Sequence, residues 1–202
     1  MEGAGRKPEV AIVPGNGGGG CIRGSNFYGW AERALQGAGY TVRMPEGGMP
    51  DPLRARESIW VPFITNELGA GAGTVLVGHS SGAAAALRVA EQTRLAGLVL
   101  VAGYDDDLGD ELERASGYFS RPFDWARIRS NCGFVVQFAG RLDTLVPVGA
   151  QRKVASALEL TPDAEKGADT AHWYIEQPTG DHFFSPPFPE LVEAIDRGVA
   201  ML

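Results

Sequence analysis

The stretch Gly78-His79-Ser80-Ser81-Gly82 constrains the fold of this chain more than any other. Residues 74–77 before it are apolar and rich in β-branched side chains, which predicts a buried strand. Residues 83–93 after it are rich in alanine, which predicts a helix. Glycine at both ends removes Cβ atoms where strand, turn and helix would crowd together. The sequence therefore predicts a sharp strand-to-helix turn that displays the Ser80 hydroxyl at the carboxyl edge of a sheet.

The pentapeptide alone is a weak signal. In a chain with 28 glycines, the pattern G-x-S-x-G arises by chance about 0.2 times. The alternative interpretation is a glycine-rich turn in which the serine only caps the helix. The strand and helix predicted on its two sides favour a nucleophile elbow, the turn that carries the reactive serine of α/β-hydrolases.

Predicted strands and helices alternate along the whole chain. We predict strands at residues 10–13, 40–44, 74–77, 97–102, 134–138 and 173–175, and helices at residues 27–36, 51–68, 83–93, 125–130, 148–160 and 189–201. Such alternation predicts an α/β fold with a mostly parallel, doubly wound sheet of about six strands and helices on both faces. Ser25 or Asn26 is the predicted N-cap of the first helix, and Asp51 that of the second. We find no linker or repeat, so residues 1–202 are predicted to form a single α/β-hydrolase domain.

Charge and cysteine content narrow the class of protein. A net charge of −7 and a pI near 5.0 argue against binding to nucleic acid or to an anionic membrane surface. Residues 1–7 lack the apolar core of a secretory signal, and the most apolar run, 95–104, is too short to span a bilayer. Cys21 and Cys132 form no C-x-x-C pair, and with three histidines they make no convincing metal set. We therefore expect a soluble, cytoplasmic protein without metal or cofactor.

A serine nucleophile needs a base and a carboxylate that orients the base, and in this fold they follow in the order Ser, Asp, His. Asp143 comes a few residues after the predicted strand 134–138, which places it at the same sheet edge as Ser80. His182 lies in a glycine-flanked loop before the last helix. His172 at the start of a strand is its rival, and His79 inside the turn is assigned a structural role. The predicted triad is Ser80, Asp143 and His182.

The reaction also needs hydrogen-bond donors for the oxyanion. One is the backbone N–H of Ser81, at the positive end of the predicted helix. The other is expected from the glycine-rich loop after the first strand, from either Asn16 or Gly17. The spacing Gly15-x-Gly17-x-x-Gly20 also matches a dinucleotide-binding fingerprint, but the next helix starts too late for that interpretation. Phe119 and Phe123 are candidate walls of a substrate pocket, with core packing as the alternative.

Six segments of the chain have a distinctive sequence: residues 11–19, 49–52, 55–60, 78–82, 108–111 and 113–119. Together they resemble the retinoblastoma-binding protein 9 family of small serine hydrolases, and the resemblance extends from about residue 9 to the end. It implies a compact α/β-hydrolase with Ser80, Asp143 and His182 as its triad. It also implies hydrolysis of small amides or esters, with aminopeptidase-like cleavage in some members. A protein-interaction module with little turnover and an acyl esterase or thioesterase are the alternatives.

The chain departs from the family pattern at three places. Members bind pocket proteins through an L-x-C-x-E segment, but the corresponding Leu68–Ala72 lacks both the cysteine and the acid. Binding to retinoblastoma-type proteins is therefore not predicted, and the expected partner is a small amide or ester substrate. Thr161–Thr170 resembles an insertion, and Arg141-Leu142 stand where small polar and acidic residues are expected.

Overall fold

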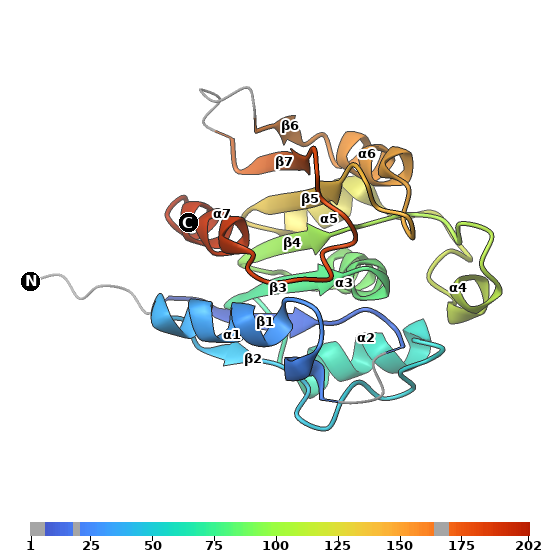
Figure 1. Cartoon of the computed structure of the whole chain (residues 1–202), viewed down its shortest axis with the longest axis horizontal. Helices are drawn as coiled ribbons and strands as arrows, with labels where there is room; N and C mark the ends of the chain where they lie inside the picture. The colour runs from blue at the N-terminus through green and yellow to red at the C-terminus, as the bar shows by residue number, and fades with distance from the viewer. Residues whose placement is uncertain (1–6, 18–20, 164–169) are drawn as a thin grey trace, which may run out of the picture.

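The computed structural model describes residues 7–17, 21–163 and 170–202. Its strands all belong to one sheet in which every pair of neighbours is parallel, in the order β2-β1-β3-β4-β5-β7-β6 (Figure 1). The strands are β1 (Glu9–Val13), β2 (Val42–Arg43), β3 (Thr74–His79), β4 (Gly97–Val101), β5 (Val135–Gly140), β6 (Thr161–Pro162) and β7 (His172–Gln177). All the loops that leave the carboxyl ends of these strands therefore meet at one edge.

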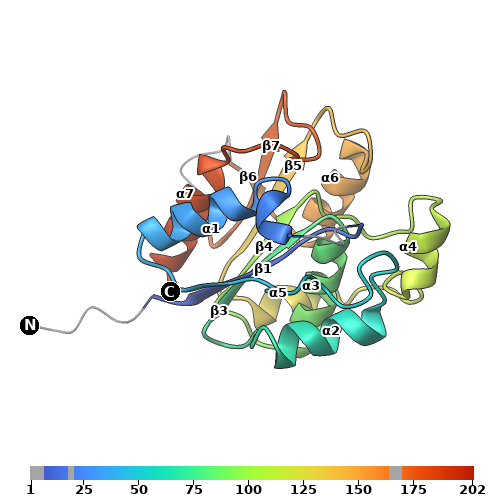
Figure 2. The same cartoon turned by 60° about the horizontal axis from the view of Figure 1, so that its bottom comes forward.

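Helices cover both faces of the sheet. They are α1 (Tyr28–Gly37), α2 (Glu57–Asn66), α3 (Ser81–Gln92), α4 (Glu111–Ser116), α5 (Trp125–Asn131), α6 (Val148–Ala157), α7 (Pro189–Val199) and the short 3-10 helix η1 (Ile22–Gly24). Helices α1 and α7 lie on one face, and α2, α3 and α5 lie on the other (Figure 2). Helix α4 projects beyond the carboxyl edge of the strands (Figure 1).

Alternate residues of the central strands enter two separate cores. Val75 and Val77 of β3 pack with the residues of α1 and α7. Leu76 between them packs with α2, α3, α5 and α6. All six residues of β3 are buried, as expected for a parallel strand with helices on both faces. The elbow predicted after β3 is therefore held by a strand whose side chains are packed on both sides.

Several predicted boundaries are wrong. The first helix is capped by neither Ser25 nor Asn26, because it begins only at Tyr28 and its N-cap is Phe27. Asp51 does not cap the second helix, because its φ of +49° and the following turn delay the helix to Glu57. The Asp51 carboxylate instead accepts a hydrogen bond from Arg56 at 2.6 Å.

The sheet has seven strands rather than about six. The extra strand, β6, lies at the start of the stretch Thr161–Thr170 and pairs with β7. Two residues are too few to give a readable alternation of apolar and polar side chains, so no periodicity revealed it. Residues 164–169 of that stretch, and Gly18–Gly20 of the glycine-rich loop, lie outside the described residues.

Candidate active site

The turn between β3 and α3 has the geometry of a nucleophile elbow. Ser80, at its apex, has φ +55° and ψ −123°, a conformation that costs a non-glycine residue on the order of 1–3 kcal/mol. A Cβ at Gly78 would lie 2.4 Å from the carbonyl oxygen of Gly82. A Cβ at Gly82 would lie 2.5 Å from the carbonyl oxygens of Val13 and Pro14. Both glycines are therefore required by close backbone approach, as the sequence predicted.

The loops after β5 and β7 bring a carboxylate and an imidazole together. His182 Nδ1 lies 2.8 Å from Asp143 Oδ2, and both residues are buried. Because the carboxylate accepts this hydrogen bond, Nδ1 carries the proton and the lone pair of Nε2 remains available to act as a base. No other histidine of the chain contacts Asp143 among the described residues.

Asp143 is fixed on every side. Its Oδ1 accepts hydrogen bonds from the backbone N–H groups of Leu145 and Val146, both at 2.9 Å. Its Oδ2 also accepts from Nε2 of Gln151 at 3.2 Å. Burial alone would raise the pKa of Asp143, but the hydrogen bonds from His182 and the two N–H groups hold it below its usual value. The carboxylate is therefore ionised and oriented toward the imidazole.

Ser80, Asp143 and His182 all lie at or just beyond the carboxyl ends of β3, β5 and β7. Among the described residues, no hydrogen bond joins the Ser80 hydroxyl to the His182 imidazole. Such hydrogen bonds are often long before substrate binds. Parallel pairing of the strands places the three side chains at one sheet edge, in the chain order expected for this fold.

A buried hydrogen-bond network that the sequence did not reveal connects the elbow to the histidine loop. His79 Nε2 lies 2.9 Å from the backbone carbonyl oxygen of His182, and Nδ1 lies 2.6 Å from the Tyr28 hydroxyl. The carbonyl only accepts, so Nε2 carries the proton and Nδ1 accepts from Tyr28. The Tyr28 oxygen in turn accepts from the N–H of Gly15 and from Nδ2 of Asn26. Every donor in this network has an acceptor.

His79 is therefore more than a packing residue. Burial, together with the neighbouring His182, lowers the pKa of His79 to about 3. Its ring centroid lies 4.8 Å from that of His182. A neutral His79 places no positive charge beside the His182 imidazole. Tyr28 is an aromatic residue at a helix start, and nothing in the sequence links it to a partner fifty positions later.

The loop after β1 distinguishes the two candidate oxyanion donors. The N–H of Gly17 donates to the Pro52 carbonyl at 2.8 Å, so it is not free to bind an oxyanion in this conformation. The N–H of Asn16 has no acceptor among the described residues. The N–H of Ser81 lies at the N-terminus of α3, where the helix dipole favours negative charge.

Glu113 of α4, which the sequence analysis missed, holds both donor residues by their side chains. Its Oε1 accepts hydrogen bonds from Asn16 Nδ2 at 3.0 Å and from the Ser81 hydroxyl at 2.8 Å. The hydroxyl of Tyr104 donates to the Ser81 hydroxyl oxygen at 3.2 Å. Glu113 Oε2 is buried and has no hydrogen-bond partner among the described residues. A carboxylate from α4 thus connects this projecting helix to the elbow.

The two phenylalanines have different surroundings. Phe123 is buried in the core formed with α3, and the Arg88 guanidinium lies 3.7 Å from its ring centroid. This is the core packing that the sequence analysis named as the alternative to a pocket role. Phe119 is only partly buried, and its ring lies 5.4 Å from that of Tyr104. Phe119 therefore contacts Tyr104, which donates to Ser81, whereas Phe123 contacts Phe119, with the two ring centroids 6.4 Å apart.

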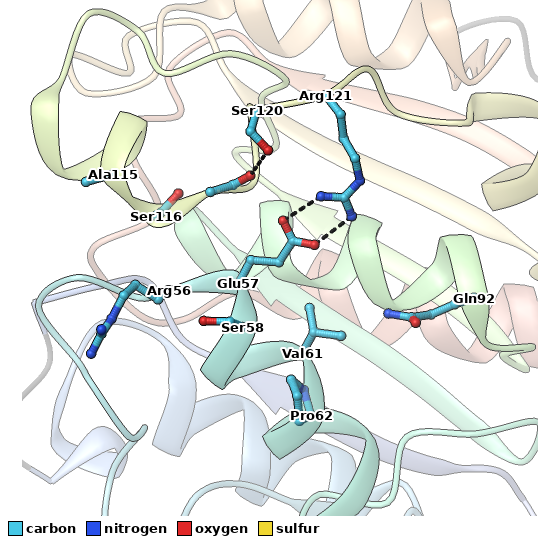
Figure 3. A pocket seen from close by; sticks show the side chains of 11 residues that line it. Arg56, Glu57, Ser58, Val61, Pro62, Gln92, Ala115, Ser116, Ser120 and Arg121 are labelled. Atoms are coloured by element: carbon cyan, nitrogen blue, oxygen red, sulfur yellow. Dashed lines mark hydrogen bonds and ion pairs between the residues drawn. The ribbon is translucent and has the colours of Figure 1, made fainter.

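His172 and the hollow beside α2 lie away from Ser80 and His182. His172 is at the amino end of β7, the opposite end of the strand from the His182 loop. A hollow of about 570 Å³ lies between α2 and residues 115–121. Figure 3 shows the side chains that line it, among which Glu57 and Arg121 form two hydrogen bonds. Neither Ser80 nor His182 lines it.

In the described ranges, no three His, Cys, Asp or Glu residues are grouped to hold a metal ion. None of the helices described there has the length and apolarity needed to cross a bilayer.

The fold and the elbow define an α/β-hydrolase. The chain belongs to the alpha/beta hydrolase family, whose sequence model matches residues 10–201. The serine hydrolase RBBP9 of Rattus norvegicus is 47% identical over 152 residues, which cover 75% of this chain and 80% of the relative. This protein is accordingly a serine hydrolase, and the resemblance noted from its sequence is confirmed.

Solved structures support the fold. The ydeN gene product of B. subtilis superposes with a TM-score of 0.80 at 21% identity, over 96% of this chain and 100% of the other. Acyl-protein thioesterase 2 of Zea mays superposes with a TM-score of 0.59 at 13% identity, over 96% and 94% of the two chains. At these identities the similarity concerns the fold alone.

Proposed function

We propose that Ser80, His182 and Asp143 form the catalytic triad and that the enzyme cleaves small amides or esters. The observation that carries the proposal is the 2.8 Å hydrogen bond between His182 Nδ1 and Asp143 Oδ2. It leaves Nε2 of His182 as a base at the sheet edge that also carries the strained Ser80. The assignment of Ser80 as nucleophile follows from its φ of +55° at the elbow.

The reaction proceeds through an acyl-enzyme. His182 Nε2 removes the proton of the Ser80 hydroxyl as its oxygen attacks the substrate carbonyl, and Asp143 stabilises the resulting imidazolium. The imidazolium then gives the proton to the leaving group as the carbonyl–leaving-group bond breaks. Water, deprotonated by the same imidazole, releases the acid product and restores Ser80.

We assign the oxyanion hole to the backbone N–H groups of Ser81 and Asn16. Gly17 is set aside because its N–H is bound to Pro52. Glu113 orients both residues through their side chains. Two donors held in advance stabilise the oxyanion more than water does, because they need no reorganisation during the reaction.

A fluorophosphonate probe and p-nitrophenyl acetate test the triad. Wild-type protein is expected to bind the probe covalently and to hydrolyse the ester, whereas Ser80→Ala should do neither. Ser130→Ala serves as the control, because the exposed Ser130 hydroxyl binds the Arg127 carbonyl within α5 and takes no part in the proposed site. Persistent labelling of Ser80→Ala would contradict the assignment. A wild-type protein that ignores both reagents would favour the interaction-module alternative.

A further inference from the structure

Large apolar side chains are exposed at few places in the described part of this molecule. Most of them lie in segments that follow the carboxyl ends of the strands. Seven are exposed among the described residues: Leu53, Leu112, Leu142, Leu145, Phe184, Met201 and Leu202. The last two are the C-terminal residues of the chain. The other five, which we call the apolar collar, lie in the segments that follow β2, β4, β5 and β7. Single exposed apolar residues are normal on protein surfaces, but five in four segments that all follow parallel strands of one sheet are a pattern.

The loops of β5 and β7 carry three collar residues directly beside the proposed triad. Leu142 and Leu145 flank Asp143, and the N–H of Leu145 donates to its carboxylate. The ring of Phe184 lies 5.2 Å from the imidazole of His182. Since His182 gives its proton to the leaving group, the side chain of Phe184 borders the space in which the leaving group departs.

The remaining two collar residues border the oxyanion loop. Leu112 precedes Glu113, whose carboxylate binds the side chains of Asn16 and Ser81. Leu53 follows Pro52, whose carbonyl accepts from Gly17. Every member of the collar is therefore within two positions, along the chain, of a proposed triad residue or of a residue that binds Asn16, Gly17 or Ser81.

We propose that the apolar collar binds a bulky apolar group of the substrate, so that the preferred substrates are esters or amides with an apolar acyl or leaving group larger than acetyl or methyl. The proposal rests on the catalytic assignment above. Because Phe184 contacts His182 and the N–H of Leu145 binds Asp143, the group that the collar binds belongs to the molecule whose carbonyl reaches Ser80. The net charge of −7 disfavours an anionic membrane surface as the occupant.

The test compares kcat/KM for p-nitrophenyl acetate and p-nitrophenyl hexanoate below the critical micelle concentration. Four added methylenes, each about half as buried as in a protein core, should raise kcat/KM about tenfold for the wild type. The selectivity is the kcat/KM for the hexanoate divided by that for the acetate. Leu112→Ser and Leu142→Ser should each lower this ratio about two- to threefold, and the double variant about fivefold. A second series with methyl, butyl and benzyl acetates examines the leaving-group side in the same way.

Leu202→Ser is the matched control, because Leu202 is 62% exposed and Leu142 is 59% exposed, yet Leu202 lies outside the collar. It should keep the wild-type ratio in both series. The inference is overturned if neither series shows a preference, if the collar variants and the control respond alike, or if long esters are hydrolysed only as micelles. Loss of all ester hydrolysis in the wild type would instead refute the catalytic assignment, so the two failures can be told apart.

Discussion

Replacing Tyr28 by phenylalanine removes one oxygen atom from the buried network between the elbow and the histidine loop. In the variant, His79 Nδ1 loses its donor in a fully buried site, and the N–H of Gly15 loses its acceptor. An unsatisfied buried polar group costs about 1–3 kcal/mol. Because Gly15 is only partly buried, we expect the free energy of unfolding to fall by about 2 kcal/mol. For a chain of this length that lowers Tm by roughly 4–8 °C.

The same change should slow catalysis. Without its hydrogen bond to Tyr28, His79 holds the backbone carbonyl of His182 less firmly, and the imidazole loses its fixed position. We expect kcat for p-nitrophenyl acetate to fall about tenfold, or about 1.4 kcal/mol in the barrier, with KM unchanged within about twofold. Circular dichroism for Tm and steady-state kinetics below Tm measure the two effects separately.

Three further variants separate an effect on positioning from an effect on stability alone. Tyr40→Phe removes a buried hydroxyl that donates to Asp196 at 2.6 Å, at the other end of α1, so it should lower Tm but leave kcat unchanged. His79→Gln keeps one donor and one acceptor and should retain kcat within about threefold, whereas His79→Leu should not. Because burial lowers the pKa of His79 to about 3, the acid limb of the kcat profile should not move in His79→Gln. Equal kcat in Tyr28→Phe and Tyr40→Phe would refute the positioning role.

Four other predictions follow from named contacts and from burial. Asp143→Asn should lower kcat about 10³- to 10⁴-fold, because the amide no longer fixes the proton on Nδ1 of His182; a fall of less than tenfold would speak against the triad. The pKa of Asp143 is lower in the folded state than its ordinary value of 3.8. The ionised carboxylate therefore stabilises the fold above pH 3.8, and this stabilisation is lost as the pH falls through the lower, folded-state pKa. The free energies of unfolding of wild type and Asp143→Asn should therefore converge in acid. Glu113→Ala should lower kcat about tenfold by releasing the side chains of Asn16 and Ser81, with Glu111→Ala, which makes no such contact, as the control. Cys21 is exposed, while burial raises the pKa of the Cys132 thiol to about 12, so a thiol reagent should label one cysteine in the native protein and both after unfolding; two labelled in the native protein would contradict the packing.

The elbow and the order of the active-site loops could be predicted from sequence because both depend on local constraints. Glycine is needed at positions 78 and 82 because the strand turns at once into a helix there. A Cβ at either position would lie too close to a backbone carbonyl oxygen. Asp143 and His182 each follow an apolar strand. In a parallel sheet the carboxyl ends of strands share an edge, so the meeting of these two side chains follows from topology.

What the sequence did not predict depends on tertiary contacts. Asp51 followed by Pro52 is a good local N-cap signal, but the Asp51 carboxylate binds Arg56 instead and the helix starts later. Similarly, the choice between Asn16 and Gly17 could not be made from residue type. It depends on the Pro52 carbonyl, which is distant in sequence and occupies the N–H of Gly17.

The network through His79 also explains how separate loops can keep one geometry. The loop after β1 and the loop after β7 have no covalent connection near the site, and each could move independently of the elbow. His79 is part of the elbow itself, and its two ring nitrogens bind Tyr28, which holds Gly15, and the carbonyl of His182. A neutral imidazole suits this position, because it donates from one nitrogen and accepts at the other without opposing the charge on His182. The proposed nucleophile, base and oxyanion loop are thereby positioned relative to a single buried residue.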